Sequence, residues 1–100
     1  MKSIRELSDN IAEEIDDAEK YILLALEYKE KDPELAKLYY SLSADELGHS
    51  IKLHTSAVKE IEMYKQEKGE PPADMMAVYE YLHKKNIEHT NKVRMYQSQY

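Results

Sequence analysis

Apolar side chains recur at steps of three and four residues along most of the chain. This is the periodicity of amphipathic helices that bury one face. Two polar breaks, Asp32-Pro33 and Gly69 to Pro72, divide the pattern into three segments. Asp is a favoured N-cap and Pro a favoured first helical residue, whereas Gly followed by Pro ends a helix. The pattern therefore predicts helices over about residues 3–31, 33–68 and 73–98.

Each predicted helix carries one apolar stripe. The first stripe comprises Ile4, Ile11, Ile15, Ala18, Ile22, Ala25 and Leu26. The second comprises Leu35, Tyr39, Leu42, Glu46, His49, Leu53, Ala57 and Ile61. The third comprises Met75, Val78, Tyr79, Leu82, Asn86, His89, Val93 and Tyr96. The short turn after the first helix makes the first two helices antiparallel neighbours.

Three helices leave these stripes incompletely covered, and a second copy of the chain would cover them. We therefore expect an all-α fold in a single domain over residues 1–100. Its elements are a long antiparallel helical hairpin and a third helix, and dimerisation completes a four-helix-type bundle.

Composition narrows the possible functions. The net charge of -6 is repelled by phosphate backbones, so no nucleic-acid partner is expected, whereas small cations are attracted. The absence of Cys excludes disulfides and iron–sulfur sites. No apolar run approaches the 18 or so residues of a membrane span, and the N-terminal sequence lacks an apolar signal core. A cytoplasmic protein without membrane contact is expected.

Glu46 and His49 form a Glu-x-x-His step inside the apolar stripe of the second predicted helix. Buried charge is costly unless it is paired or bound to metal, and di-iron carboxylate bundles use this step as a ligand pair. The hairpin places five acidic residues of the first helix at the same level: Glu13, Glu14, Asp16, Asp17 and Glu19. By helical phase, Glu14 and Glu19 flank the first stripe at about 70° to either side, whereas the others point to solvent.

Either Glu14 or Glu19 can therefore join Glu46 and His49. Such a set is half of the four carboxylates and two histidines that hold two metal ions, and two copies of the chain would supply the rest. Carboxylate and imidazole ligands suit iron, manganese and zinc.

A wider pattern surrounds these residues. It comprises Glu14, Tyr21, Ala25, Ala36, Tyr39, Ser43, Glu46 and His49. Through it, residues 11–53 resemble the first helix pair of the ferritin-like superfamily, in particular its rubrerythrin-like branch. That family has a Tyr seven residues after its first Glu, so the resemblance favours Glu14 over Glu19. The third helix has no clear counterpart, and the chain is more similar to half-ferritins such as encapsulated ferritin, which assemble their site between two subunits.

The resemblance implies a di-iron cofactor, or manganese or zinc in its place, held by the catalytic ligands Glu14, Glu46 and His49. It implies ferroxidase or peroxidase activity, the oxidation of Fe(II) by O2 or peroxide, in iron storage, iron detoxification or peroxide removal. Tyr21 and Tyr39 would assist metal binding as hydrogen-bond donors to the ligands. The implied partners are further copies of the chain, as a dimer or a multiple of dimers, and an encapsulating shell protein.

Two other functions fit the residues. Glu46 and His49 could be a buried pair that fixes helix register in a non-enzymatic interaction module, or the chain could be a ferritin-like protein without metal chemistry. The remaining histidines carry weaker signals. His83 belongs to a second Glu-x-x-His, from Glu80, whose phase predicts a solvated pair. His54 is expected at the surface, and His89 is expected as a hydrogen-bonded core or interface histidine.

Overall fold

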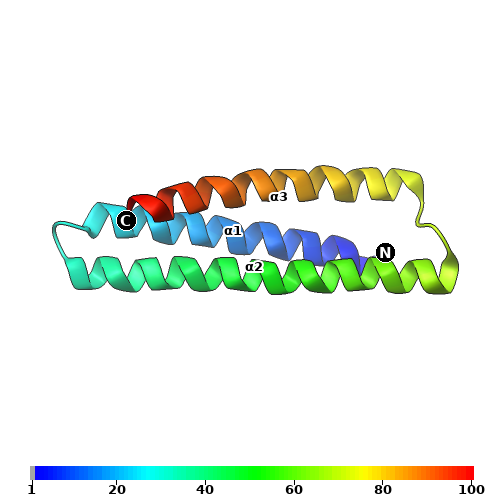
Figure 1. Cartoon of the computed structure of the whole chain (residues 1–100), viewed down its shortest axis with the longest axis horizontal. Helices are drawn as coiled ribbons and strands as arrows, with labels where there is room; N and C mark the ends of the chain where they lie inside the picture. Colours follow the sequence, from blue (N-terminus) through cyan, green and yellow to red (C-terminus); the bar gives the residue numbers. More distant parts are fainter. Residues whose placement is uncertain (1) are drawn as a thin grey trace.

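Three long helices make up the part of the chain that the structure describes. The computed structural model describes residues 2–100, in which the helices are α1 (Lys2–Tyr28), α2 (Pro33–Lys68) and α3 (Ala73–Gln99). They lie side by side in a rod of 55 × 18 × 17 Å, with α2 antiparallel to both α1 and α3 (Figure 1). The prediction of an all-helical chain with three helices is confirmed. Within residues 2–100, no helix has the length and apolarity needed to cross a membrane.

The helix ends follow from the two polar breaks. The Asp32 side chain accepts a hydrogen bond from the Leu35 amide at 3.2 Å and so caps α2, with Pro33 at the first helical position. Gly69 ends α2 with φ of 83°, a left-handed conformation that favours glycine. The expected end of the first helix near Lys31 is wrong by three residues. Asp32 is extended as an N-cap, so the chain must leave the helix at Tyr28 to make the turn.

The core lies mainly between α1 and α2. The predicted stripe of α1 is confirmed, with Leu26 half-buried and the other six residues buried. On α2 the buried residues are Ala36, Ser43, Leu47, Ser50, Ala57 and Ile61. Over most of the helix, the buried face therefore lies one residue after the predicted stripe of Leu42, Glu46 and His49. Small residues let two helices approach closely. At one such point, the Ser43 hydroxyl donates a hydrogen bond to the Ala18 carbonyl at 2.7 Å.

α3 covers one side of the α1–α2 hairpin. Val93 is its only fully buried residue in the described chain, and Val78 is 60% exposed although its phase predicted burial. The Gln97 amide donates a hydrogen bond to the Ser43 hydroxyl at 3.0 Å, and Tyr100 stacks on Tyr40. These contacts tie α3 to the flank of the hairpin that carries Ser43 and Tyr40.

The opposite flank of the hairpin is not covered by α3. We call it the open face and define it by Glu14, Tyr21, Tyr28, Tyr39, Glu46 and His49. Within residues 2–100, α3 makes hydrogen bonds, ion pairs and stacking contacts with α1 and α2, but none of them involves these six residues. The predicted apolar stripe of α2 therefore lies toward a half-exposed surface rather than in the core of one chain.

Candidate metal centre

Three potential metal ligands meet on the open face. Glu46 and His49 lie one turn apart on α2, and the antiparallel hairpin brings Glu14 of α1 to the same level. One ligand atom from each residue lies within 4.8 Å of the others. His49 Nδ1 is 3.4 Å from Glu14 Oε2 and 3.9 Å from Glu46 Oε2. The residues that the sequence singled out for metal binding are thus neighbours in the folded chain.

The two carboxyls of this cluster compete for ionisation. A hydrogen bond with Glu14, together with burial and repulsion from the Glu14 charge, raises the pKa of Glu46 from 4.5 to about 7. His49 acts in the opposite direction, because its positive form favours the Glu46 anion. Two carboxylates at such close range cannot both ionise freely, so without a cation they share a proton near neutral pH.

Glu14 has an unsatisfied oxygen. Its Oε2 is buried and has no hydrogen-bond partner in residues 2–100 when both carboxyls are ionised, and the 3.4 Å approach of His49 lacks hydrogen-bond geometry. A buried carboxylate oxygen without a donor is costly. A proton on Glu46 supplies one donor, and a bound cation would satisfy the same oxygen while neutralising both charges.

The cluster lies at the edge of the bundle rather than inside it. The exposed fraction of the side chain is 53% for His49, 28% for Glu14 and 20% for Glu46. The expectation that His49 points into the core is therefore wrong for one chain, because the core of α2 is one position further round the helix. The half-exposed position leaves one side of the cluster open to a cation or to another protein surface.

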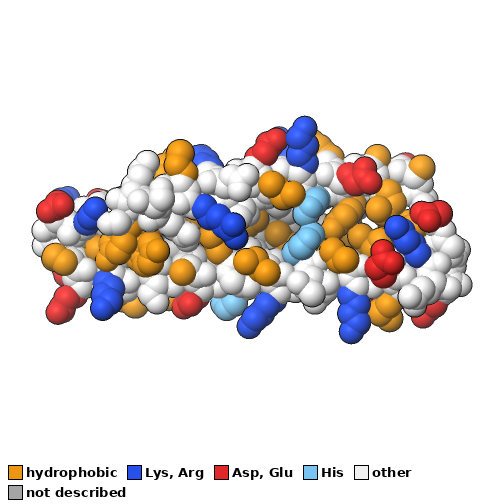
Figure 2. Space-filling view, viewed as in Figure 1, with side chains coloured by type: hydrophobic (Ala, Val, Ile, Leu, Met, Phe, Trp, Pro, Cys, Tyr) orange, Lys and Arg blue, Asp and Glu red, His pale blue; other side chains and the backbone are white. Residues whose placement is uncertain are grey.

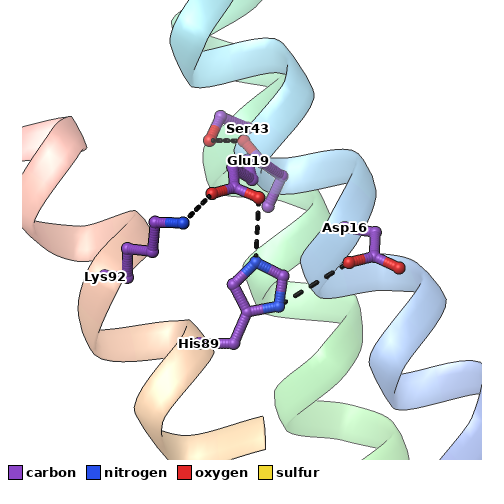
Figure 3. Close-up of polar contacts among 6 residues, drawn as sticks. Asp16, Glu19, Ser43, His89 and Lys92 are labelled. Atoms are coloured by element: carbon purple, nitrogen blue, oxygen red, sulfur yellow. Dashed lines mark hydrogen bonds and ion pairs between the residues drawn. The ribbon is translucent and has the colours of Figure 1, made fainter.

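Glu19, the other candidate on α1, belongs to a different contact. Its carboxylate accepts a hydrogen bond from Lys92 Nζ at 3.0 Å and lies 3.1 Å from His89 Nε2 (Figure 3). Asp16 Oδ1 lies 3.7 Å from the other ring nitrogen of His89. Glu14 and Glu19 are five residues apart, about 140° around the helix, so one faces the open face and the other faces α3. His89 is an interface histidine, as its phase predicted.

We expect Glu19→Gln to loosen the docking of α3 on α1. Hydrogen bonds from Lys92 and His89 lower the pKa of Glu19 below its usual 4.5. This contribution to stability is therefore complete above pH 4.5 and is lost as pH falls through the lowered pKa. Because the pair is partly exposed, the expected loss in free energy of unfolding is about 1 kcal/mol at pH 7. Urea denaturation at pH 7 and pH 3.5 should show a larger loss at pH 7 than at pH 3.5. Glu13→Gln, at an exposed site, should leave stability unchanged at both.

Tyr21 and Tyr39 form an aromatic patch beside the cluster. Their rings stack with centroids 6.1 Å apart, and Tyr28 stacks on Tyr39 at 6.2 Å. Tyr21 lies seven residues after Glu14 on α1, and Tyr39 lies seven residues before Glu46 on α2. Each separation is about 10 Å along the helix axis. Within residues 2–100, no hydrogen bond joins them to the cluster. The predicted hydrogen bonds from Tyr21 and Tyr39 to the metal ligands are therefore not seen within the described residues of a single chain.

His54 and His83 form a contact that the sequence did not predict. Their rings stack across α2 and α3 with centroids 4.7 Å apart and planes 9° apart. Both are half-buried, so the expectations of a surface His54 and a solvated His83 are wrong, although Glu80 is exposed as expected. The buried side of α2 is centred on Ser43, Leu47 and Ser50. His54 lies close to that side by helical phase, so its position on the helix could have predicted its burial.

No family model matches this chain, and no curated protein or solved structure matches it either.

Proposed function

We propose that this chain is a ferritin-like di-iron carboxylate protein that binds Fe(II) with Glu14, Glu46 and His49 and oxidises it with O2 or peroxide. In this proposal, two copies of the chain share the site. The observation that carries it is the convergence of the three side chains on one uncovered face, with Glu14 Oε2 buried and without a donor. A divalent cation would resolve both the repulsion and the missing contact.

The donor set suits the metal. Carboxylate oxygens and one imidazole nitrogen are ligands for Fe(II), Mn(II) and Zn(II), and no soft sulfur ligand favours copper. The set is also flexible, because a partly exposed His49 and two Glu side chains can adjust to a cation. Three ligands from one chain are, however, half of the set that holds a di-iron pair in helical bundles.

The surroundings of the cluster support a second copy as the source of the other half. The open face carries three stacked tyrosines, and the neighbouring Leu38 of α2 is 53% exposed. Tyrosine suits subunit interfaces because it has an apolar body and a polar tip. A two-fold contact through this face would bring two Glu14–Glu46–His49 clusters together and cover the aromatic patch. An encapsulating shell partner stays a prediction of the resemblance, and a cytoplasmic location stays a prediction from the hydropathy of the sequence.

The residues of the chain have defined tasks in this chemistry. Bound iron would supply the electrons that reduce O2 or peroxide. Glu14 and Glu46 neutralise the charge of the cations, and His49 provides the nitrogen ligand at the exposed edge. Because Glu46 holds a proton near neutral pH, that proton must leave its carboxyl before a cation binds. The solvent-exposed side of the cluster gives the proton a path to water.

An anaerobic Fe(II) titration of the metal-free protein, followed by air, tests the proposal. We expect saturation near one iron per chain and a new ferric absorbance after air is admitted. Glu46→Ala should lose both signals, whereas Glu13→Ala, at an exposed site on α1, should keep them. Absence of stoichiometric binding, or equal signals in Glu46→Ala, would contradict a metal site at this cluster.

One observation also favours a non-enzymatic interaction module. The proton shared by Glu14 and Glu46 can join α1 to α2 without any metal, which would fix the register of the hairpin. In that case Glu46→Leu should fold as well as the wild type or better, and metal should have no effect on either protein. The iron titration separates the two functions, because only the metal site predicts saturable binding.

A further inference from the structure

A second concave site lies on the other side of the hairpin, between α2 and α3. Ile11 and Ile15 of α1 form its floor, Ile51 of α2 and Ile87 of α3 line it, and its volume is about 360 Å³. Figure 2 shows orange apolar atoms along the middle of this face, with pale-blue histidines between α2 and α3. We call this site the α2–α3 groove. Its size is within the range of small-molecule pockets.

The groove is distinct from the metal cluster. Glu46 of the cluster and Ile51 of the groove are five residues apart, which is about 140° around α2. The groove therefore opens on the flank that α3 covers in part, and the cluster lies on the flank that α3 leaves free. An inference about the groove does not rest on the proposed iron chemistry.

The charge of the groove is opposite to that of the protein. The chain has 20 acidic residues and a net charge of -6, yet none of the residues lining the groove is Asp or Glu. Arg94 of α3 lines the groove and forms no ion pair with any residue of 2–100. An unpaired guanidinium beside an apolar floor is complementary to an organic anion rather than to a metal ion.

Two imidazoles add a flat wall to the groove. His54 and His83 both line it and stack on each other, and Tyr79 stacks on His83 with centroids 5.8 Å apart. Burial and the neighbouring His83 lower the pKa of His54 below its usual 6.5. The His54 ring is therefore mainly neutral at pH 7 and presents aromatic surface to a ligand, whereas its protonation on acidification adds positive charge.

We propose that the α2–α3 groove binds a small organic monocarboxylate, with its carboxylate on Arg94 and its apolar body on Ile11 and Ile15. The single guanidinium balances one negative charge, which favours a monoanion over a phosphate dianion. The planar fork of Arg matches the two oxygens of a carboxylate. The asparagine and threonine side chains of α3 that line the groove supply further polar contacts.

Benzoate is a suitable probe because benzamide has nearly the same shape without the charge. In NMR titrations of the full chain at pH 7, benzoate should shift the ring signals of His54 and His83 with saturation. Benzamide should bind about tenfold or more weakly, and acetate, which lacks the apolar body, should also bind weakly. Arg94→Gln should weaken benzoate binding by a similar factor. The matched variant Arg5→Gln, at an exposed site on α1 away from the groove, should not weaken it.

The pH dependence gives an independent readout. Tyr79 of α3 stacks on His83, Arg94 of α3 lines the same groove, and α1 contributes only Ile11 and Ile15 to it. As pH falls from 7.5 to 5.5, protonation of His54 should strengthen benzoate binding, because benzoate keeps its charge in this range. The double variant His54→Gln/His83→Gln should lose that pH dependence. Arg94→Gln should still weaken benzoate binding in the double-variant background.

Three results would overturn the proposal. Benzoate could fail to perturb the groove at any pH, benzamide could bind as well as benzoate, or Arg5→Gln could weaken binding as much as Arg94→Gln. Circular dichroism of each variant shows whether the helices are intact, so loss of binding through unfolding is recognised as such. None of these results bears on iron binding at Glu14, Glu46 and His49.

Discussion

Glu46→Gln is expected to stabilise the metal-free protein at pH 8 and to leave it unchanged at pH 4. The pKa of Glu46 is raised from 4.5 to about 7 by the shared proton, burial and the charge of Glu14. A raised pKa in the folded state contributes stability that is complete below pH 4.5 and is lost as pH rises through 7. Glutamine keeps a neutral, hydrogen-bonding side chain at every pH and should avoid this loss.

The size of the effect follows from the shift. One pKa unit corresponds to about 1.4 kcal/mol, so the full shift would be worth about 3 kcal/mol. Glu46 is one-fifth exposed, and solvent screening reduces the expected gain at pH 8 to about 1–2 kcal/mol. For a domain of this size, that gain raises Tm by about 5–15 °C. Thermal unfolding from pH 4 to pH 8, in the presence of a chelator, measures it.

Glu13→Gln is the matched control for this prediction. Glu13 is an exposed residue of α1 next to Glu14, so its substitution removes one negative charge without touching the cluster. Its unfolding curve should follow that of the wild type at each pH. A Glu46→Gln protein that is less stable at pH 8, or a difference that does not change with pH, would mean that Glu14 and Glu46 do not share a proton.

The second large effect is expected from metal. A cation that binds only the folded protein should stabilise it by about 2.7 kcal/mol at a free concentration 100 times its Kd. Zn(II) is a convenient probe because it suits the same ligands and has no redox chemistry. Thermal unfolding with increasing Zn(II) should show a rising Tm that a chelator reverses. The gain should shrink below pH 7, since Glu46 must lose its proton to bind metal.

Variants of the three ligands should abolish this stabilisation. Loss of an outer partner of a metal ligand commonly costs 10–100-fold in affinity, so loss of Glu14, Glu46 or His49 itself should cost about 100-fold or more. Glu19→Gln should keep the metal effect, because Glu19 is bound to Lys92 and His89 on the other flank of α1. Equal stabilisation of Glu46→Gln and the wild type would place the metal elsewhere.

Much of this fold was predictable from local signals. Asp32 and Pro33 fixed the start of α2, and Gly69 with the following prolines fixed its end, because these residues restrict the backbone wherever they occur. The isoleucine stripe of α1 also predicted its buried face. Apolar periodicity alone failed over much of α2, because its fully buried residues include the small Ala36 and the polar Ser43, neither of which lies on the predicted stripe. A serine in an amphipathic pattern is normally assigned to the surface, and the burial of Ser43 depends on the hydrogen bond from its hydroxyl to the Ala18 carbonyl.

The candidate site was predictable in part. Spacing within one helix paired Glu46 with His49, but the choice between Glu14 and Glu19 depended on which flank of α1 faces α3. That choice is made by tertiary contacts such as Glu19 with Lys92, which have no signal in helical spacing. The His54–His83 stack is the same kind of feature, since it joins two helices that meet only in the folded chain.

Native mass spectrometry of the protein loaded anaerobically with Fe(II) tests the central claim most directly. It reports the number of chains and the number of irons in the same particle. A site shared by two copies predicts dimers, or multiples of dimers, that carry two irons per pair of chains, and loss of the iron in Glu46→Ala. Monomers that each carry one iron, or dimers that stay free of iron at saturating Fe(II), would contradict it.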